Sequence, residues 1–336
     1  MFSVIRRGQM CLSFIFFCLS IEQSLAGSIR DKVEDRGYLR CGIERSVPFL
    51  SKSNPLENAA REYCQALTVA LFRDKSAVKI IHIPSGESTS YLANNKIDLV
   101  MLAGIDRSTK IQKTILSAPL LINGMKILNL KGDKAPQRLN GKRVCTLNNK
   151  LNSQGLAVFG QKQQISFSVL SYDTPEQLLE VVLNHSCKVI ALPRIELLQF
   201  KQKIRLAFPL AEIINSTISK PKLGIRVLAS DQEWINVTSA FGHALLEAEI
   251  ENISSENIDI VASTSTKQAV QELLGLRGGL ALSLGLDKQW AYRVIKTHGN
   301  YNEIYQRHFG ENSLFPITRD PISLLLNESV YKSIQN

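Results

Sequence analysis

The sequence predicts an alternating α/β protein with two domains. The chain has 336 residues, 44% of them hydrophobic, and a mean hydropathy of −0.02. These values are typical of a globular chain and exclude disordered and collagen-like proteins. At roughly 150 residues per domain, the length favours two domains. Short β-rich runs alternate with longer amphipathic stretches, which is typical of α/β proteins.

The first series of elements lies before residue 103. The pattern predicts strands over 39–43, 78–83 and 98–102, a helix over 57–72 and a polar helical segment around Tyr91. In the 57–72 helix, apolar residues such as Tyr63 and Leu67 recur near one face. We therefore expect this helix to cover a sheet.

A second series begins at residue 144. The pattern predicts strands over 144–147, 166–170 and 188–192, a helix near Gly155 and another from Thr174. Thr174, Pro175 and Gln177 have the spacing of a capping box with proline in the first turn. This second α/β series indicates a second domain.

After residue 224 the pattern is mainly helical. Ser230 and Glu233 predict a capping box before a helix over 234–250. Asp287 predicts the cap of a helix that Gly299 ends, and Asn300 predicts the cap of the next helix.

The N-terminal stretch has the pattern of a secretory signal peptide. Arg6 and Arg7 precede an apolar run over 11–21 that is too short to span a bilayer, and Ala26 ends a small-residue cleavage site. We expect a signal peptide over residues 1–26, and a mature protein in the periplasm that begins at Gly27.

The cysteines of the mature chain number four: Cys41, Cys64, Cys145 and Cys187. An even number in an oxidising compartment favours two disulfides, although four cysteines allow three pairings. A zinc site is the rival interpretation, but the sequence has no CxxC pair and no two histidines four residues apart. No metal or cofactor is expected.

The positive charge is spread along the chain. Lys and Arg number 40 against 30 Asp and Glu, which gives a formal net charge of +10. No run of basic residues interleaves with aromatic residues as nucleic-acid-binding motifs do. Nucleic acid is not an expected partner, and the diffuse charge indicates solubility or weak attraction to anions.

Several stretches, most of them C-terminal, resemble a known family. Residues 285–292 (GLDKQWAY), 294–296 (VIK), 299–301 (GNY) and 303–305 (EIY) resemble the signature of the periplasmic general L-amino-acid-binding proteins of ABC transporters, in solute-binding protein family 3. Residues 27–41, 231–234 and 272–275 are similar to further parts of that family. All four mature cysteines lie where the family has its own.

The resemblance implies the two-lobed periplasmic binding protein fold, an α/β fold with two Rossmann-like lobes joined by two crossing hinge strands. Lobe 1 is expected to contain residues 27–125 and to return with the C-terminal helices over 223–336, and lobe 2 to contain 126–222. The implied disulfides are Cys41 with Cys64 in lobe 1, and Cys145 with Cys187 in lobe 2.

The resemblance also implies a function. The protein is expected to be the solute-binding component of an amino-acid ABC transporter, a monomer that closes over an amino acid or a related acid and engages an inner-membrane permease. Binding rather than catalysis is implied, because the sequence has no Gly-x-Ser-x-Gly, His-Glu-x-x-His or phosphate-loop motif. A hydrolytic enzyme with Glu87 and Asp98 as its carboxylates is the less favoured alternative.

Candidate ligand residues follow from the family's pattern. A bound amino acid needs a cation and backbone N–H donors for its carboxylate. The family's threonine and arginine correspond to Thr109 and Lys110, although Lys110 also fits a solvated loop. Phe49 is either an apolar wall of the site or a core residue. The donor turn corresponds to residues 148–152, with the candidates Asn148, Asn149, Lys150 and Asn152.

The expected partner of the ligand's ammonium is missing. The family's aspartate, six residues after its fourth cysteine, corresponds to Pro193, and Arg194 follows it. Residues 58–62 have also lost a carboxylate typical of the family. Two interpretations stay open: a cleft that prefers anionic ligands through Lys110, Lys150 and Arg194, or a degenerate paralogue without a transport ligand that acts in adhesion or sensing.

Overall fold

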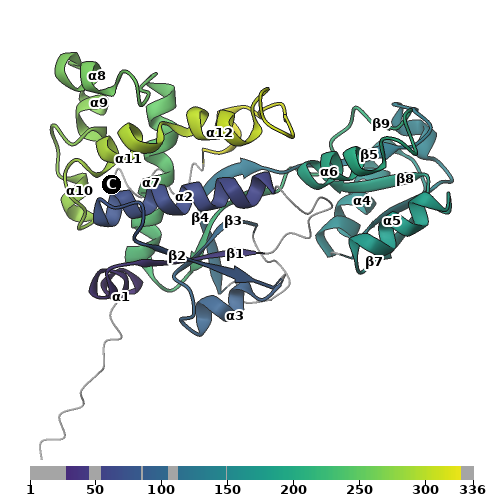
Figure 1. The fold of residues 1–336 in the computed structure, drawn as a ribbon, viewed down its shortest axis with the longest axis horizontal. Coiled ribbons are helices and arrows are strands. Elements are labelled where there is room, and N and C mark those ends of the chain that lie inside the picture. The colour runs from purple at the N-terminus through teal and green to yellow at the C-terminus, as the bar shows by residue number, and fades with distance from the viewer. Residues whose placement is uncertain (1–27, 45–53, 85, 105–112, 149, 327–336) are drawn as a thin grey trace, which may run out of the picture.

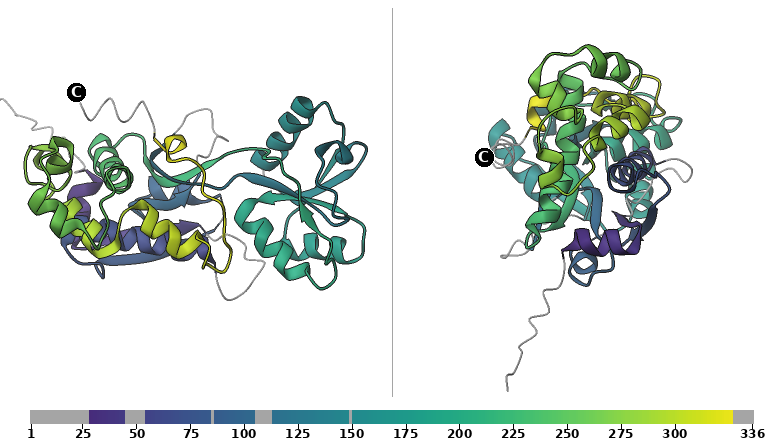
Figure 2. Two further views of the ribbon diagram at one scale, coloured as in Figure 1. Left: turned by 90° about the horizontal axis from the view of Figure 1, so that it is seen from above. Right: turned by 90° about the vertical axis from the view of Figure 1, so that its left-hand side faces the viewer.

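Two separate five-stranded sheets, each flanked by helices, form the fold (Figure 1). The computed structural model describes residues 28–44, 54–84, 86–104, 113–148 and 150–326. The α/β architecture with two lobes is confirmed. Figure 2 shows the chain passing between the lobes along neighbouring strands.

The sheet of lobe 1 has the strand order β2-β1-β3-β10-β4. Strand β1 pairs in parallel with β2 and β3, whereas β10 runs antiparallel between β3 and β4. The bounds are β1 Leu39–Glu44, β2 Val78–Ile83, β3 Leu99–Ala103, β4 Thr114–Ile122 and β10 Lys222–Leu228.

Helices cover both faces of this sheet. Buried residues of α2, α7, α11 and α12 share the largest apolar cluster of the lobe, whereas α3 covers a smaller cluster on the other face (Figure 1). The bounds are α1 Ile29–Arg36, α2 Pro55–Phe72, α3 Ser88–Ala93, α7 Gln232–Ile250, α8 Ile258–Thr264, α9 Gln268–Leu273, α10 Leu280–Ser283, α11 Trp290–His298, α12 Tyr301–Phe309 and the 3₁₀ turn Ile322–Leu324.

Lobe 2 repeats this plan with the strand order β7-β6-β8-β5-β9. Strand β6 is parallel to β7 and β8, and β5 is antiparallel to β8 and β9. The bounds are β5 Met125–Asn129, a 3₁₀ turn Pro136–Leu139, β6 Arg143–Leu147, α4 Lys150–Gln163, β7 Ser168–Tyr172, α5 Pro175–Leu183, β8 Val189–Pro193, α6 Arg194–Ile204 and β9 Glu212–Ile213.

Two disulfides fasten a sheet strand in each lobe. Cys41 on β1 is bonded to Cys64 on α2, and Cys145 on β6 is bonded to Cys187 just before β8. These are the pairings that the family resemblance implies. The loops that they close, 23 and 42 residues in sequence separation, make each worth on the order of 3–4 kcal/mol in the chain-entropy account.

Several sequence expectations need correction. Asp231, not Ser230, caps α7, because its carboxylate accepts from the Trp234 N–H. Gln289, not Asp287, precedes α11, and the Asp287 carboxylate instead accepts from the Gln289 N–H. The strand expected over 166–170 lies two residues later, as β7. By contrast, the capping boxes at Thr174 and Asn300 are formed as expected.

No helix in the described ranges is long and apolar enough to cross a membrane. The glycine-interrupted stretch over 273–286 instead contributes the short helix α10 and the turns around it.

Glu62 on α2 holds α11 and α12 of lobe 1 against α2. Its carboxylate pairs with Arg307, lies 2.6 Å from His308 Nε2 and lies 3.5 Å from His298 Nδ1. Burial raises the pKa of the Glu62 carboxyl, but bonds from His298, His308 and Arg307 outweigh burial and hold it well below its usual range. Ionised Glu62 therefore stabilises the packing of α11 and α12 on α2.

We expect Glu62→Gln to lower the melting temperature at pH 7 by several degrees, because its three basic partners lose their carboxylate. A carboxyl with a lowered folded-state pKa contributes stability above its unfolded pKa and loses that contribution as the pH falls through the folded value. The difference between the wild type and the variant should persist down to about pH 4.5 and shrink below it. Glu34→Gln, in an exposed pair with Arg30, is the control. A difference that does not change with pH contradicts this account.

Candidate functional site

The two lobes meet at a pair of hydrogen-bonded crossings. The Asn123 N–H donates to the Pro221 carbonyl at 3.2 Å, and the Met125 N–H donates to the Ser219 carbonyl at 3.1 Å. A Cβ at Gly124 would lie 2.9 Å from the Ser219 oxygen, so glycine permits this close approach. A short two-stranded crossing of this kind is suited to act as a hinge.

The carboxyl ends of the parallel strands define where a ligand would bind. In open α/β sheets, ligands bind outside these ends, where the strand order reverses. Glu44 ends β1 and Gly104 follows β3 in lobe 1, while Asn148 follows β6 in lobe 2. We therefore take these three strand ends as the candidate binding site.

The end of β3 has an unusual backbone conformation at Leu102. This residue lies in β3 with φ at +49° and is only 5% exposed. A buried leucine in this left-handed region is strained, and such residues cluster at ligand-binding sites. The register of β3 against β10 also shifts here, between Gly224 and Arg226.

Glu44 and Gly104 are joined by one arginine. Arg226 on β10 donates from Nη1 to the Gly104 carbonyl at 2.8 Å, and its Nη2 lies 3.1 Å from Glu44 Oε1. Its side chain is 5% exposed, compared with 31% for Glu44. Neither Arg226 nor Glu44 was predicted from the sequence to belong to the site. Glu44 directly follows a predicted strand, which is a usable signal, but Arg226 lies in an unpredicted strand between apolar neighbours.

The predicted residues of lobe 2 cluster at the end of β6. Asn148 is exposed and donates from Nδ2 to Asp173 Oδ1 at 2.8 Å. Asn152 is 9% exposed, and its Nδ2 lies 3.4 Å from Thr146 Oγ1. Lys150 begins α4 at the same edge. The structure thus brings this part of the predicted set together, while contact with a ligand stays a prediction.

Four of the predicted candidates lie outside the described residues. They are Phe49, Thr109 and Lys110, together with Asn149 of lobe 2. Their roles stay predictions from the family resemblance.

Arg194 is held by protein groups at the hinge. Its guanidinium donates to the Ile122 carbonyl at 2.8 Å and to the Thr318 carbonyl at 2.9 Å, and it pairs with Asp320 at 3.3 Å. The neighbouring Pro193 ends β8. These contacts give Arg194 a structural role at the crossing, so they do not favour the predicted ligand role.

Asp320 extends this contact to the second crossing. Its other oxygen lies 3.5 Å from Lys220 Nζ, and its side chain is 18% exposed. Residues 317–320, which follow α12, are thereby fastened across the hinge; we call them the hinge strap. The hinge strap connects the C-terminal part of lobe 1 to Arg194, the first residue of α6 in lobe 2.

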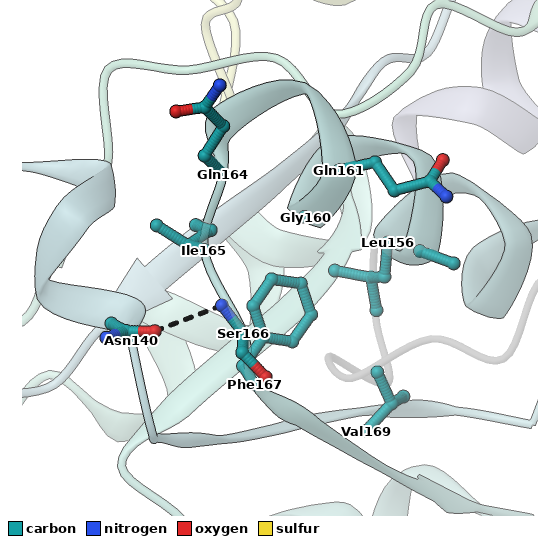
Figure 3. Close-up of a pocket in the computed structure, with 10 residues that line it drawn as sticks. Asn140, Leu156, Gly160, Gln161, Gln164, Ile165, Ser166, Phe167 and Val169 are labelled. Atoms are coloured by element: carbon teal, nitrogen blue, oxygen red, sulfur yellow. Dashed lines mark hydrogen bonds between the residues drawn. The ribbon is translucent and has the colours of Figure 1, made fainter.

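A cavity of about 540 Å³ lies elsewhere, within lobe 2 (Figure 3). Leu156, Gly160, Ile165, Phe167 and Val169 line it between α4 and the start of β7, and Asn140 accepts there from the Ser166 N–H. None of the predicted ligand residues is among those that line it.

The alternative catalytic carboxylates, Glu87 and Asp98, have different surroundings. Asp98 is 1% exposed and is neutralised by Arg36 and Arg40. Glu87 is exposed at the start of α3. Within the described ranges, no cluster of three or more His, Cys, Asp or Glu side chains could hold a metal ion.

Two α/β lobes joined by a double crossing form the fold of the two-lobed periplasmic binding proteins. A solved structure with the same fold is the ABC transporter periplasmic binding protein from Brucella ovis with glutathione bound. It has a TM-score of 0.72 and 22% identity, and the match covers 87% of this chain and 94% of that one.

Relatives in sequence agree with this class. The putative amino-acid ABC transporter-binding protein YhdW of Escherichia coli K12 is 26% identical over 316 residues, 92% of each chain. The general L-amino acid-binding periplasmic protein AapJ of Rhizobium johnstonii is 24% identical over 298 residues, 85% of this chain and 86% of AapJ. No protein-family model matches the chain. The chain is thus a distant relative of amino-acid ABC transporter-binding proteins, as the sequence resemblance indicated.

We expect Asp320→Asn to loosen the hinge strap, because asparagine keeps the shape but removes the charge that pairs with Arg194 and Lys220. Amide exchange should accelerate about tenfold at Ile317, whose N–H donates to the Phe309 carbonyl. Asp259→Asn, in an exposed pair with Lys296, should leave this amide unchanged. Equal exchange in the wild type and Asp320→Asn would show that the strap does not depend on the charge.

Proposed function

We propose that this protein is the periplasmic solute-binding component of an amino-acid ABC transporter. The observation that carries the proposal is similarity to YhdW over 92% of both chains, together with a fold whose two lobes are joined by a double crossing. The ligand is an amino acid or a related acid, and the partner is an inner-membrane permease.

Capture would proceed by rotation about the crossings. The candidate site has one half in each lobe, at Glu44 and Gly104 on one side and at Asn148 on the other. Closing the lobes would bring these halves onto one ligand and exclude water, which strengthens polar contacts with the ligand's charged groups. The permease would then recognise the closed form.

The periplasm suits the chemistry of the cysteines. Both disulfides lie in the interior, since all four cysteines are at most 1% exposed. Structural disulfides form and persist in oxidising compartments such as the periplasm. Together with the signal-peptide pattern and cleavage near Ala26, this supports export.

The charge preference of the cleft depends on fewer cations than the three that the sequence predicted. Because Arg194 is engaged with Asp320 and two carbonyls, a preference for anionic ligands would rest on Lys110 and Lys150. We propose binding without turnover, since the relatives are named as binding proteins.

We expect at least one compound in a panel of L-amino acids and organic acids to raise the melting temperature by several degrees. A ligand at one hundred times its dissociation constant adds about 2.7 kcal/mol to the free energy of unfolding. Differential scanning fluorimetry, followed by calorimetric titration of the hits, measures this.

Two other results of the panel would contradict binding without turnover as the protein's function. A flat panel, with the protein shown to be folded by circular dichroism, would contradict the transport function and favour the degenerate paralogue that acts in adhesion or sensing. Consumption of a panel compound over time would indicate an enzyme.

A further inference from the structure

Arg226 is a buried charge between two apolar residues of β10. Its neighbours Ile225 and Val227 are fully buried in the main cluster of lobe 1. Because side chains alternate along a strand, Arg226 lies on the opposite face of the sheet, the face that α3 covers. There its guanidinium reaches Gly104 and Glu44, at the ends of β3 and β1.

Stability alone does not account for this arginine. Burying a charge costs free energy that one ion pair rarely recovers, and apolar replacements of such pairs are often neutral or stabilising. Moreover, Arg226 Nε is buried and has no hydrogen-bond partner among the described residues. An incompletely satisfied buried cation therefore calls for a reason other than folding.

The position of the Arg226–Glu44 pair supplies a reason for the buried arginine. Glu44 is the last residue of β1, and with 31% of its side chain exposed it reaches the surface at the candidate binding site. Arg226 brings one positive charge to the one negative charge of Glu44. The pair as a whole adds no net charge to the lobe 1 half of the site.

We propose that Arg226 is a specificity-determining positioning residue, which neutralises Glu44 and so keeps this carboxylate from selecting ligands by charge. This inference rests on the proposed function. Any preference for anionic ligands comes from other residues, such as the predicted Lys110.

The mechanism of selection is electrostatic. Removing Arg226 leaves the Glu44 carboxylate without its arginine partner beside the ligand, which attracts cationic groups and repels anionic ones. Removing the charge of Glu44 leaves the Arg226 charge uncompensated by that carboxylate, which attracts anionic groups and repels cationic ones. Because the local dielectric is low, either change is felt more strongly than at an exposed surface.

The test is a double-mutant cycle with Arg226→Met, Glu44→Gln and the double variant. Calorimetric titration with L-arginine, L-glutamine and L-glutamate gives the ratio of dissociation constants for acidic and basic ligands. We expect Arg226→Met to shift this ratio at least tenfold toward L-arginine, Glu44→Gln to shift it at least tenfold toward L-glutamate, and the double variant to return it to within threefold of the wild type.

Two further variants separate selection from folding. Arg226→Lys keeps the charge and should keep the wild-type ratio, even if its melting temperature falls. Glu62→Gln, a partly buried glutamate away from the strand ends, should leave the ratio unchanged. If Arg226→Met does not fold, Glu44→Gln decides the test alone.

Two results would overturn the inference. One is an equal loss of affinity for all three ligands in each single variant, and the other is a double variant that does not recover. Both leave the proposed function intact, since the wild type still binds. A wild type that binds no compound of the panel would instead contradict the proposed function itself.

Discussion

The double crossing between the lobes is the constraint on which the rest of the structure depends. The chain leaves lobe 1 at Ile122 and returns at Lys222, and backbone hydrogen bonds of Asn123 and Met125 hold the two passages together. Each lobe has its own sheet, and lobe 2 has apolar clusters of its own, while Ile195 at the start of α6 packs into the main cluster of lobe 1. The same constraint places the ends of parallel strands from both lobes beside a common hinge.

Polar groups around the crossing give the hinge a defined resting geometry. Asn123 accepts from the Ile195 N–H and donates to Glu196, so the first crossing is fixed to the start of α6. Burial raises the pKa of the Glu196 carboxyl, although its bond from Asn123 partly offsets this. The hinge strap also contacts the start of α6, through Arg194. A rotation of the lobes must therefore strain or exchange these contacts, which couples the C-terminal segment to the position of lobe 2.

Much of the fold followed from local sequence patterns, and much of the site did not. The alternation of strands and helices predicted β1, β2, β6 and the helix α2, because period and capping residues are local signals. The strands β4, β5 and β10 escaped prediction, since long apolar runs in central or crossing strands have no clear alternation. The pairs Arg226 with Glu44 and Arg194 with Asp320 join residues more than one hundred positions apart. Such pairs depend on the tertiary fold, so no local pattern reveals them.

The central claim is that the two lobes close about the crossing when a ligand binds. Small-angle X-ray scattering of the protein with and without a saturating ligand tests it most directly. The account predicts a smaller radius of gyration and a narrower distance distribution in the bound state. A scattering curve that is unchanged while calorimetry reports full occupancy would contradict closure, and with it the assignment of the strand ends of both lobes to one site.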